Sequence, residues 1–166
     1  MRHLVHLCHH RWSIPVIAVM ASGQGGRYAM IRHRLGIARE TLRRAIGWLT
    51  DEDYVMPNPG YGHPLRPELL LTPWGEQIGD ACQGVWDVIE ATETDPSVIG
   101  RKWSLPVLVA ILVSDGRYTQ IQTLVEECSP RALSQTLGVL EEACLVEHVV
   151  TQARPVRAEY HLTGGG

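Results

Sequence analysis

The amino-acid sequence predicts a mainly helical α+β chain that contains two similar units, each with three helices followed by a small β-hairpin. Two observations lead to this prediction: a tryptophan-containing motif occurs twice, and each copy is followed by the same series of helix, turn and strand signals. The chain has 166 residues, and domains of roughly 70 to 90 residues can hold a core of their own. We therefore expect two domains, at residues 1–94 and 95–166.

The repeated motif is Trp-Ser-x-Pro-Val, which lies at residues 12–16 and again at residues 103–107. The matches continue in the same order over residues 12–72 and 103–163. They pair Arg27-Tyr28 with Arg117-Tyr118, Leu42 and Gly47 with Leu133 and Gly138, and Leu71-Thr72 with Leu162-Thr163. A correspondence of this length indicates a duplicated domain.

Each copy contains the start signals of three helices. Serine is a favoured N-cap residue, and a proline is tolerated in the first turn, so Ser13 and Ser104 are expected to cap the first helices. Glycine-containing loops separate the first helix from the second. The helices are expected to begin near Ser13, Arg27 and Ala38 in the first copy, and near Ser104, Arg117 and Ser129 in the second.

Two β-like segments follow the third helix in each copy, at residues 54–57 with 69–71 and at residues 145–151 with 156–162. Between the copies, apolar residues recur at the spacing of an amphipathic helix over about residues 73–92. Thr72 and Pro73 suit the N-cap and first positions of this linker helix, and Asp95-Pro96 repeats the signal at the start of the second domain. Three helices and a hairpin make a winged helix-turn-helix unit.

Arginine is concentrated in the first copy. Residues 27–44 contain six arginines and one acidic residue, Glu40, whereas residues 117–135 contain two arginines and two glutamates, giving balances of +5 and 0. Neutralisation of phosphates supplies most of the sequence-independent affinity for DNA. We therefore expect binding to double-stranded DNA in which the first copy dominates and the second adds register or a weaker half-site.

The candidate DNA contacts lie near the start of the third helix, on the second helix and in the hairpin loop. A recognition helix needs polar donors on its outer face, and arginine suits both guanine edges and phosphates. The alternative for each arginine taken singly is a solvated helix face. The candidates are Arg27, Arg32, Arg39, Glu40, Arg43, Arg44, His63 and Arg66 in the first copy, and Arg117, Arg131, Ser134, Gln135, Gln152, Arg154 and Arg157 in the second.

Three motifs of the second copy resemble the HxlR-type winged helix-turn-helix transcriptional regulators. They are Lys-Trp-Ser-Leu at residues 102–105, Ser-Pro-Arg-x-Leu-Ser-Gln-x-Leu at residues 129–137 and Tyr-x-Leu-Thr at residues 160–163. The first copy departs from the pattern, with Ile-Ala-Arg-Glu at residues 37–40 where the family usually has Ser-Pro. Regulators of this type usually act as homodimers. The resemblance therefore implies that the two copies form a pseudo-dimer, with the linker helix as part of the shared interface.

Two other function classes stay open. The net charge of −3 and the neutral second copy favour a winged-helix module that binds only protein. Alternatively, one copy has lost DNA binding and serves for interaction or dimerisation, which makes the active species a homodimer of chains. A redox- or metal-responsive regulator is the other class, because His3, His6 and His10 would line one side of a helix. Where the resemblance would place a sensing cysteine upstream of Trp103, the sequence has Glu90 and its neighbours.

The remaining motifs argue against other classes of protein. There is no nucleophile elbow, phosphate-binding loop or His-x-Glu zinc signature, so we expect no enzymatic activity and no cofactor, and we leave a small-molecule effector open as a partner. The four cysteines lack Cys-x-x-Cys spacing. The longest apolar run, at residues 105–113, is too short to span a bilayer, and a cytoplasmic location is expected.

Overall fold

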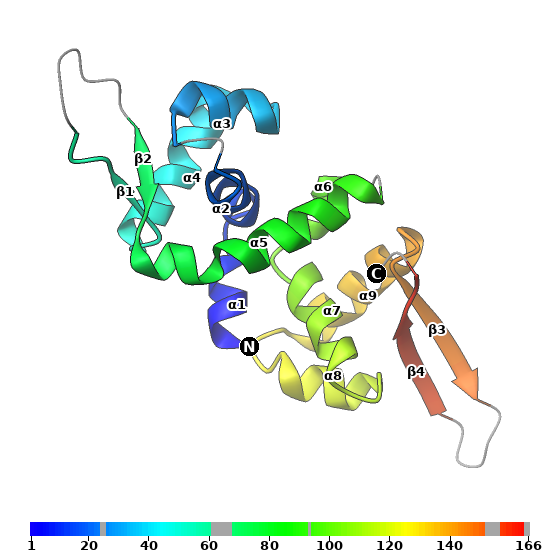
Figure 1. The fold of residues 1–166 in the computed structure, drawn as a ribbon. Helices are drawn as coiled ribbons and strands as arrows, with labels where there is room; N and C mark the ends of the chain where they lie inside the picture. The colour runs from blue at the N-terminus through cyan, green and yellow to red at the C-terminus, as the bar shows by residue number, and fades with distance from the viewer. Residues whose placement is uncertain (24–25, 61–67, 93, 152–156, 165–166) are drawn as a thin grey trace. The chain divides into compact units, whose positions relative to one another are not determined.

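The chain divides into two compact units in the computed structural model, which describes residues 1–166 except 24–25, 61–67, 93, 152–156 and 165–166 (Figure 1). The N-unit is Trp12–Ala91, and the C-unit combines Met1–Arg11 with Thr92–Gly166. The expected first domain, residues 1–94, therefore differs from the N-unit mainly at its start. Residues 1–11 belong to the C-unit because Val5 and Leu7 are buried and Arg2 binds Glu126, with 3.2 Å between Nη2 and Oε1.

The N-unit contains four helices and two strands in its described residues. Helix α2 is its central element, since every residue from Ser13 to Met20 is buried, and it packs chiefly against α5 and also against α3, α4 and β2. The strands are antiparallel, with Val55 opposite Leu71. The elements are α2 (Ser13–Ala21), α3 (Tyr28–Leu35), α4 (Arg39–Asp51), β1 (Val55–Pro57), β2 (Leu69–Leu71) and α5 (Pro73–Ala91).

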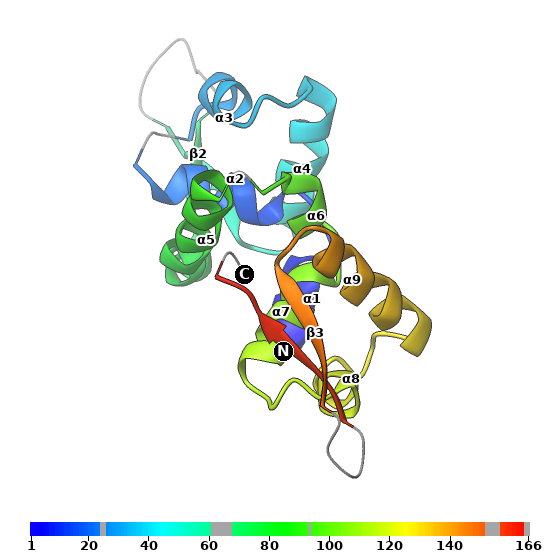
Figure 2. The ribbon, with the colours of Figure 1, turned by 90° about the vertical axis from the view of Figure 1, so that its right-hand side faces the viewer.

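The C-unit has the same order of three helices and a hairpin after two short N-terminal helices. Its core is formed by fully buried Val107, Ile121, Leu133 and Leu140. The antiparallel hairpin pairs Val146 with Leu162 and extends away from the end of α9 (Figure 2). The elements are α1 (Arg2–Leu7), α6 (Pro96–Ile99), α7 (Ser104–Leu112), α8 (Tyr118–Leu124), α9 (Pro130–Glu142), β3 (Val146–Thr151) and β4 (Arg157–Leu162).

Three of the predicted helix caps form as expected. The Ser129 hydroxyl accepts a hydrogen bond from the backbone N–H of Ala132, and the Asp95 carboxylate accepts one from Ser97. At the start of α5, the Thr72 hydroxyl accepts a hydrogen bond from the N–H of Gly75. Each bond satisfies a backbone donor that the first turn of a helix leaves without a partner.

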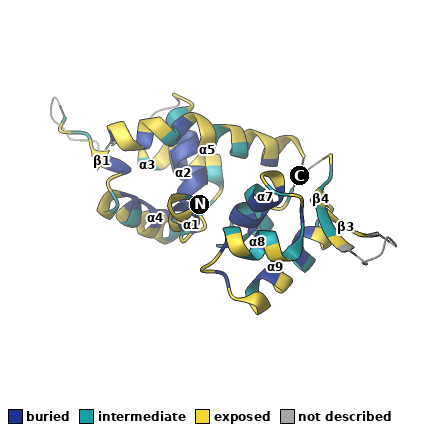
Figure 3. Cartoon of the chain, turned by 90° about the horizontal axis from the view of Figure 1, so that it is seen from below, coloured by how far each residue is buried: buried dark blue, intermediate teal, exposed yellow. Residues whose placement is uncertain are grey.

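The predicted caps at Ser13 and Ser104 are wrong. Trp12 and Trp103 occupy the N-cap positions, and each serine is the first residue inside its helix. The Ser104 hydroxyl instead donates to the carbonyl of Val98, while the buried Ser13 hydroxyl has no partner among the described residues. Both serines are buried because they lie at the base of a nearly all-apolar helix, and α2 and α7 are largely coloured as buried in Figure 3.

A close backbone contact joins each hairpin to the start of the second helix. The N–H of Leu69 donates to the carbonyl of Gly26 at 2.9 Å, and the N–H of Tyr160 donates to that of Gly116 at 2.8 Å. A Cβ at either glycine would collide with the backbone of the facing strand, and Gly116 also has a positive φ of 73°. Only glycine fits these two positions without displacing the strand. The backbone contact is extended by single antiparallel β-bridges, one between Arg27 and Glu68 and one between Arg117 and Glu159.

No helix in the described part of the chain is both long enough and apolar enough to cross a lipid bilayer.

Substitution of Gly116 tests the close contact in the C-unit. Gly116→Ala should lower the free energy of unfolding by about 1–3 kcal/mol, because alanine is strained at this φ and its Cβ meets the strand. Gly138→Ala is the matched control: it lies within α9, and an added Cβ there meets nothing within 4 Å. This second change should raise stability by about 0.5–1 kcal/mol. Equal stability of both variants in denaturant titrations would contradict the predicted contact.

Candidate nucleic-acid interface

Helix α4 has one packed face and one exposed face. Leu42, Ala45, Ile46 and Leu49 are buried against the N-unit core. Three arginines and Glu40 lie on the opposite face, and all four are exposed. The spacing of 3.6 residues per turn separates the two sets, because the apolar residues recur at intervals of three and four. The exposed set consists of Arg39, Glu40, Arg43 and Arg44.

Glu40 binds two of the arginines on this face. Its carboxylate accepts hydrogen bonds from Nε and Nη2 of Arg43, each at 2.8 Å, and from Nε of Arg44 at 3.1 Å. These hydrogen bonds, those from Arg43 first, lower the pKa of Glu40 to about 2. The carboxylate is therefore ionised throughout the physiological pH range. Glu40 cancels one of the two positive charges and holds both guanidinium groups along the exposed face.

The other predicted N-unit residues differ in their placement. Arg27 is the exposed N-cap residue of α3, and Arg32 is exposed further along α3. Arg34, which contributed to the charge count, binds Glu90 of α5 with 2.7 Å between Nη2 and Oε2. His63 and Arg66 lie outside the described residues. The structure thus brings Arg39, Arg43 and Arg44 together on one helix, whereas Arg34 forms an ion pair with Glu90 of α5.

The corresponding face in the C-unit lies on α9. Arg131, Ser134 and Gln135 are all exposed there. The Tyr118 hydroxyl donates to the carbonyl of Pro130 at 3.0 Å and lies 3.3 Å from the Ser134 hydroxyl. This contact joins the start of α8 to the start of α9. The face is polar, but it carries only one positive charge among these three residues.

Arg117 does not extend the exposed face of α9 as a separate positive charge. Its Nε lies 3.7 Å from Oε1 of Glu159, so the guanidinium is drawn toward β4 of the hairpin. Arg157 is the first residue of β4, and nothing further of its side chain is described. Gln152 and Arg154 lie outside the described residues.

The N-terminal histidines line a small cavity in the C-unit rather than forming the predicted set. The cavity of about 320 Å³ is lined by His3, His6 and His9, together with Arg2, Lys102 and Glu127, and His10 is absent from this lining. Within the described part of the chain, no group of three His, Cys, Asp or Glu residues is arranged to hold a metal ion. Arg2 and Lys102 line the same cavity, and their positive charges repel a divalent cation.

Three of the four cysteine thiols are buried. Burial raises the pKa of Cys82 to about 12 and also raises that of Cys128, an effect that nearby Lys102 partly offsets. Because the thiolate is the reactive form, both thiols are poor nucleophiles at neutral pH. Cys8 is buried as well, and Cys144 is the exposed thiol.

Comparison with known proteins locates the resemblance in the C-unit. Residues 98–166 match the HxlR-like helix-turn-helix family. The match confirms the sequence-based resemblance for residues 98–166, and the matched range does not include the N-unit. The family model covers α7, α8 and α9 and the β3–β4 hairpin, and it therefore includes the polar face on α9.

Two relatives from Bacillus subtilis illustrate the similarity. The chain is 30% identical over 69 residues to the uncharacterised HTH-type transcriptional regulator YvaP of strain 168. The aligned region is 42% of this chain and 64% of YvaP. The crystal structure of diamide-treated YodB shares 27% sequence identity with a TM-score of 0.41, covering 42% of this chain and 69% of that chain. The chain thus spans less than two thirds of the length of YvaP.

The pKa of Glu40 tests the arrangement on α4. Arg43→Ala should raise this pKa from about 2 toward 4.5, and Arg44→Ala should raise it less, because Arg43 supplies two of the three hydrogen bonds and the larger effect. Carbon-detected NMR titration of the Glu40 carboxyl group measures both shifts. An unchanged pKa in Arg43→Ala would show that the two side chains are not paired in solution.

Proposed function

We propose that this protein is a sequence-specific transcriptional regulator that binds double-stranded DNA through two unequal winged helix-turn-helix units. The observation that carries the proposal is the exposed face of α4, where Arg39, Arg43 and Arg44 lie together on a helix whose opposite face is packed into the core. Such a helix can enter the major groove and present guanidinium groups to base edges and phosphates. The HxlR-like match of residues 98–166 and the similarity to YvaP support the same function.

Tandem duplication is part of this proposal. Besides the sequence repeat, the two units share an unusual local geometry at matched positions. The Thr72 hydroxyl donates to the carbonyl of Asp53, and the Thr163 hydroxyl donates to that of Cys144. Asp53 and Cys144 are also the described non-glycine residues with a positive φ, at 59° and 56°. A strained turn that recurs with the same hydrogen bond supports descent of both units from one ancestor.

The two units would contribute differently to DNA binding. The α4 face presents three arginines, partly compensated by Glu40, whereas the α9 face presents Arg131 with the uncharged Ser134 and Gln135. Phosphate contacts position a protein on the duplex, and contacts to base edges give specificity. We therefore assign the larger share of phosphate binding to the N-unit. Glutamine on α9 suits hydrogen bonding to an adenine edge.

Salt dependence of binding tests the assignment of α4. Arg39→Ala should weaken binding to DNA fragments selected from the genome about 5- to 30-fold and reduce the salt slope by about 1, because one phosphate or base contact is lost. Arg34→Ala is the matched control: it removes the same charge, but from a side chain that binds Glu90. Its salt slope should stay unchanged. Absence of salt-dependent binding by the unmodified chain would instead favour a protein-binding module.

Glu40 should restrain non-specific binding. Glu40→Gln leaves Arg43 and Arg44 without their counter-charge, so affinity for random duplex DNA should rise about 3- to 10-fold and the salt slope should steepen by about 1. Asp51→Asn removes an exposed carboxylate at the other end of α4 and should change neither quantity. If both substitutions changed affinity and salt slope equally, Glu40 would act only through the net charge of the chain and not through its pairing with Arg43 and Arg44. Fluorescence anisotropy with a random-sequence duplex measures both quantities.

The stoichiometry on DNA tests the pseudo-dimer. If the two units of one chain act together, with α5 as part of their interface, one chain should bind each duplex site. Light scattering of the complex should then give the mass of one chain plus one duplex. A complex with two chains would favour the alternative in which one unit serves for dimerisation.

A further inference from the structure

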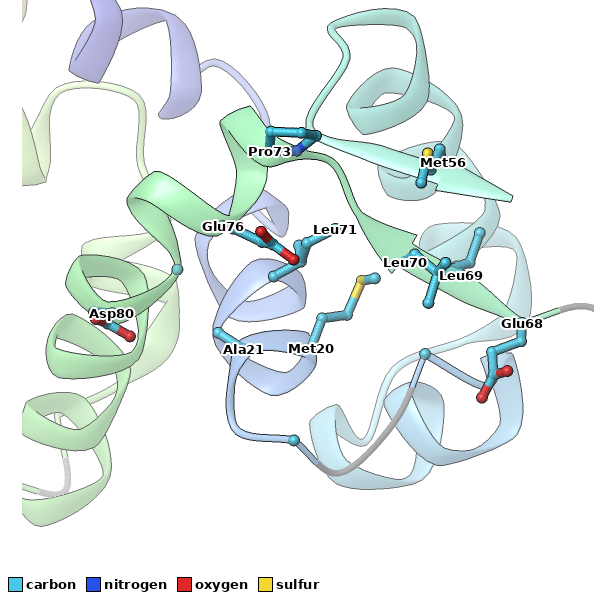
Figure 4. Close-up of a pocket in the computed structure, with 13 residues that line it drawn as sticks. Met20, Ala21, Met56, Glu68, Leu69, Leu70, Leu71, Pro73, Glu76 and Asp80 are labelled. Carbon is cyan, nitrogen blue, oxygen red and sulfur yellow. The ribbon is translucent and has the colours of Figure 1, made fainter. Parts of the chain in front are cut away.

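A cavity opens in the N-unit between α2, the β1–β2 hairpin and the first turns of α5 (Figure 4). Its volume is about 670 Å³, which lies in the range of sites that hold small organic ligands. The elements around it leave it partly open to solvent. The lining residues that the argument uses are Met20, Leu69, Leu71, Glu68, Glu76 and Asp80.

The floor of this cavity is apolar. Met20 and Leu69 are buried, and Leu71 is half-buried beside them. Figure 4 shows the side chains of Met20 and Leu71 directed toward the same central space. The flexible, polarisable thioether of Met20 can adapt to an irregular ligand surface, and the two leucines add aliphatic contact area. The floor therefore favours an occupant with a hydrophobic body.

Part of the cavity volume exists because the facing helices α2 and α5 carry alanine and glycine, which have small or no side chains, at this point. Gly79 of α5 lies against Ala21 of α2, where an added Cβ at Gly79 would come within 3.0 Å of the Ala21 Cβ. Neither residue projects a long side chain into the cavity. The close approach of the two helices at this point fixes one end of the cavity, and β2 forms the opposite wall.

The rim of the cavity is negatively charged. Glu76 and Asp80 lie on α5 and are exposed, and Glu68 lies just before β2, where its Oε2 accepts a hydrogen bond from Asn58 at 2.9 Å. Figure 4 shows Glu76 directed from the first turns of α5 toward Leu71 and Met20. No arginine, lysine or histidine is among the described residues that line the cavity. Three carboxylates around an apolar floor complement a ligand that is both hydrophobic and positively charged.

We propose that the N-unit cavity binds a small lipophilic organic cation, with its hydrophobic body against Met20, Leu69 and Leu71 and its charge toward Glu76, Asp80 and Glu68. As an effector site it rests on the proposed function, but its binding chemistry does not depend on DNA. A neutral or anionic ligand of the same shape gains the apolar contacts and lacks the attraction to the rim. Charge should therefore decide which hydrophobic ligands bind.

Two hydrophobic ions of equal shape and opposite charge test the proposal. Isothermal titration of the full chain with tetraphenylphosphonium should give saturable binding to one site, and tetraphenylborate should bind at least tenfold more weakly. Glu76→Gln with Asp80→Asn should weaken binding of tetraphenylphosphonium about tenfold and leave binding of tetraphenylborate unchanged or tighter. Because both residues are exposed and the replacements keep their shapes, the fold should be retained, which a thermal melt checks.

Asp87→Asn is the matched control, because it removes an exposed carboxylate from the same helix at a position outside the cavity. It should leave the affinity for tetraphenylphosphonium unchanged. Equal affinity for the two ions, equal effects of Asp87→Asn and the rim substitutions, or no saturable binding would each overturn the proposal. Because no DNA is present, this outcome is independent of the proposed function. Loss of DNA binding with intact ion binding would overturn only the regulator assignment.

Discussion

The contact between a glycine carbonyl and the second strand of the hairpin is the constraint on which each unit depends. Gly26 faces Leu69 in the N-unit, and Gly116 faces Tyr160 in the C-unit, each through one short backbone hydrogen bond. The next residue in each case, Arg27 or Arg117, is the N-cap residue of the second helix. The hairpin therefore fixes where the helix begins. Without a glycine there, the strand would have to move away and the hairpin would lose its connection to the helices.

Ion pairing changes the meaning of the charge distribution in the N-unit. The arginine-rich segment contains six positive charges, but Arg34 binds Glu90 and Glu40 binds two more arginines. These are exposed pairs, which contribute little to stability because water screens them. Their effect is on geometry, since the hydrogen bonds to Glu40 orient the Arg43 and Arg44 guanidinium groups on the exposed face of α4. A carboxylate on this face also repels phosphates and can accept a hydrogen bond from cytosine.

The sequence was sufficient for the elements whose signals are local. Asp95, Thr72 and Ser129 form the caps that their residue types predict, because a cap depends only on the first helical turn. The same reasoning fails at Ser13 and Ser104, because each serine is the first residue inside its helix, and the Ser104 hydroxyl donates to the carbonyl of Val98 instead. The pairing of Glu40 with Arg43 and Arg44 was not predicted, although spacings of three and four residues place these side chains next to one another on a helix. Pairs that join distant segments, such as Arg34 with Glu90 and Arg2 with Glu126, have no such local signal.

The cavity and the exposed face of α4 use different surfaces of the N-unit, so an occupant of the cavity would not touch the arginines that we propose to contact DNA. The two are connected through Gly26 and Leu69, which both line the cavity and form the hydrogen bond that holds the hairpin to the start of α3. A ligand can change DNA binding only if it binds two arrangements of this connection with different affinity. A ligand that separates β2 from Gly26 would favour an arrangement in which the hairpin and α3 are uncoupled. The glycine contact that builds the unit is therefore also the element through which such a ligand would act.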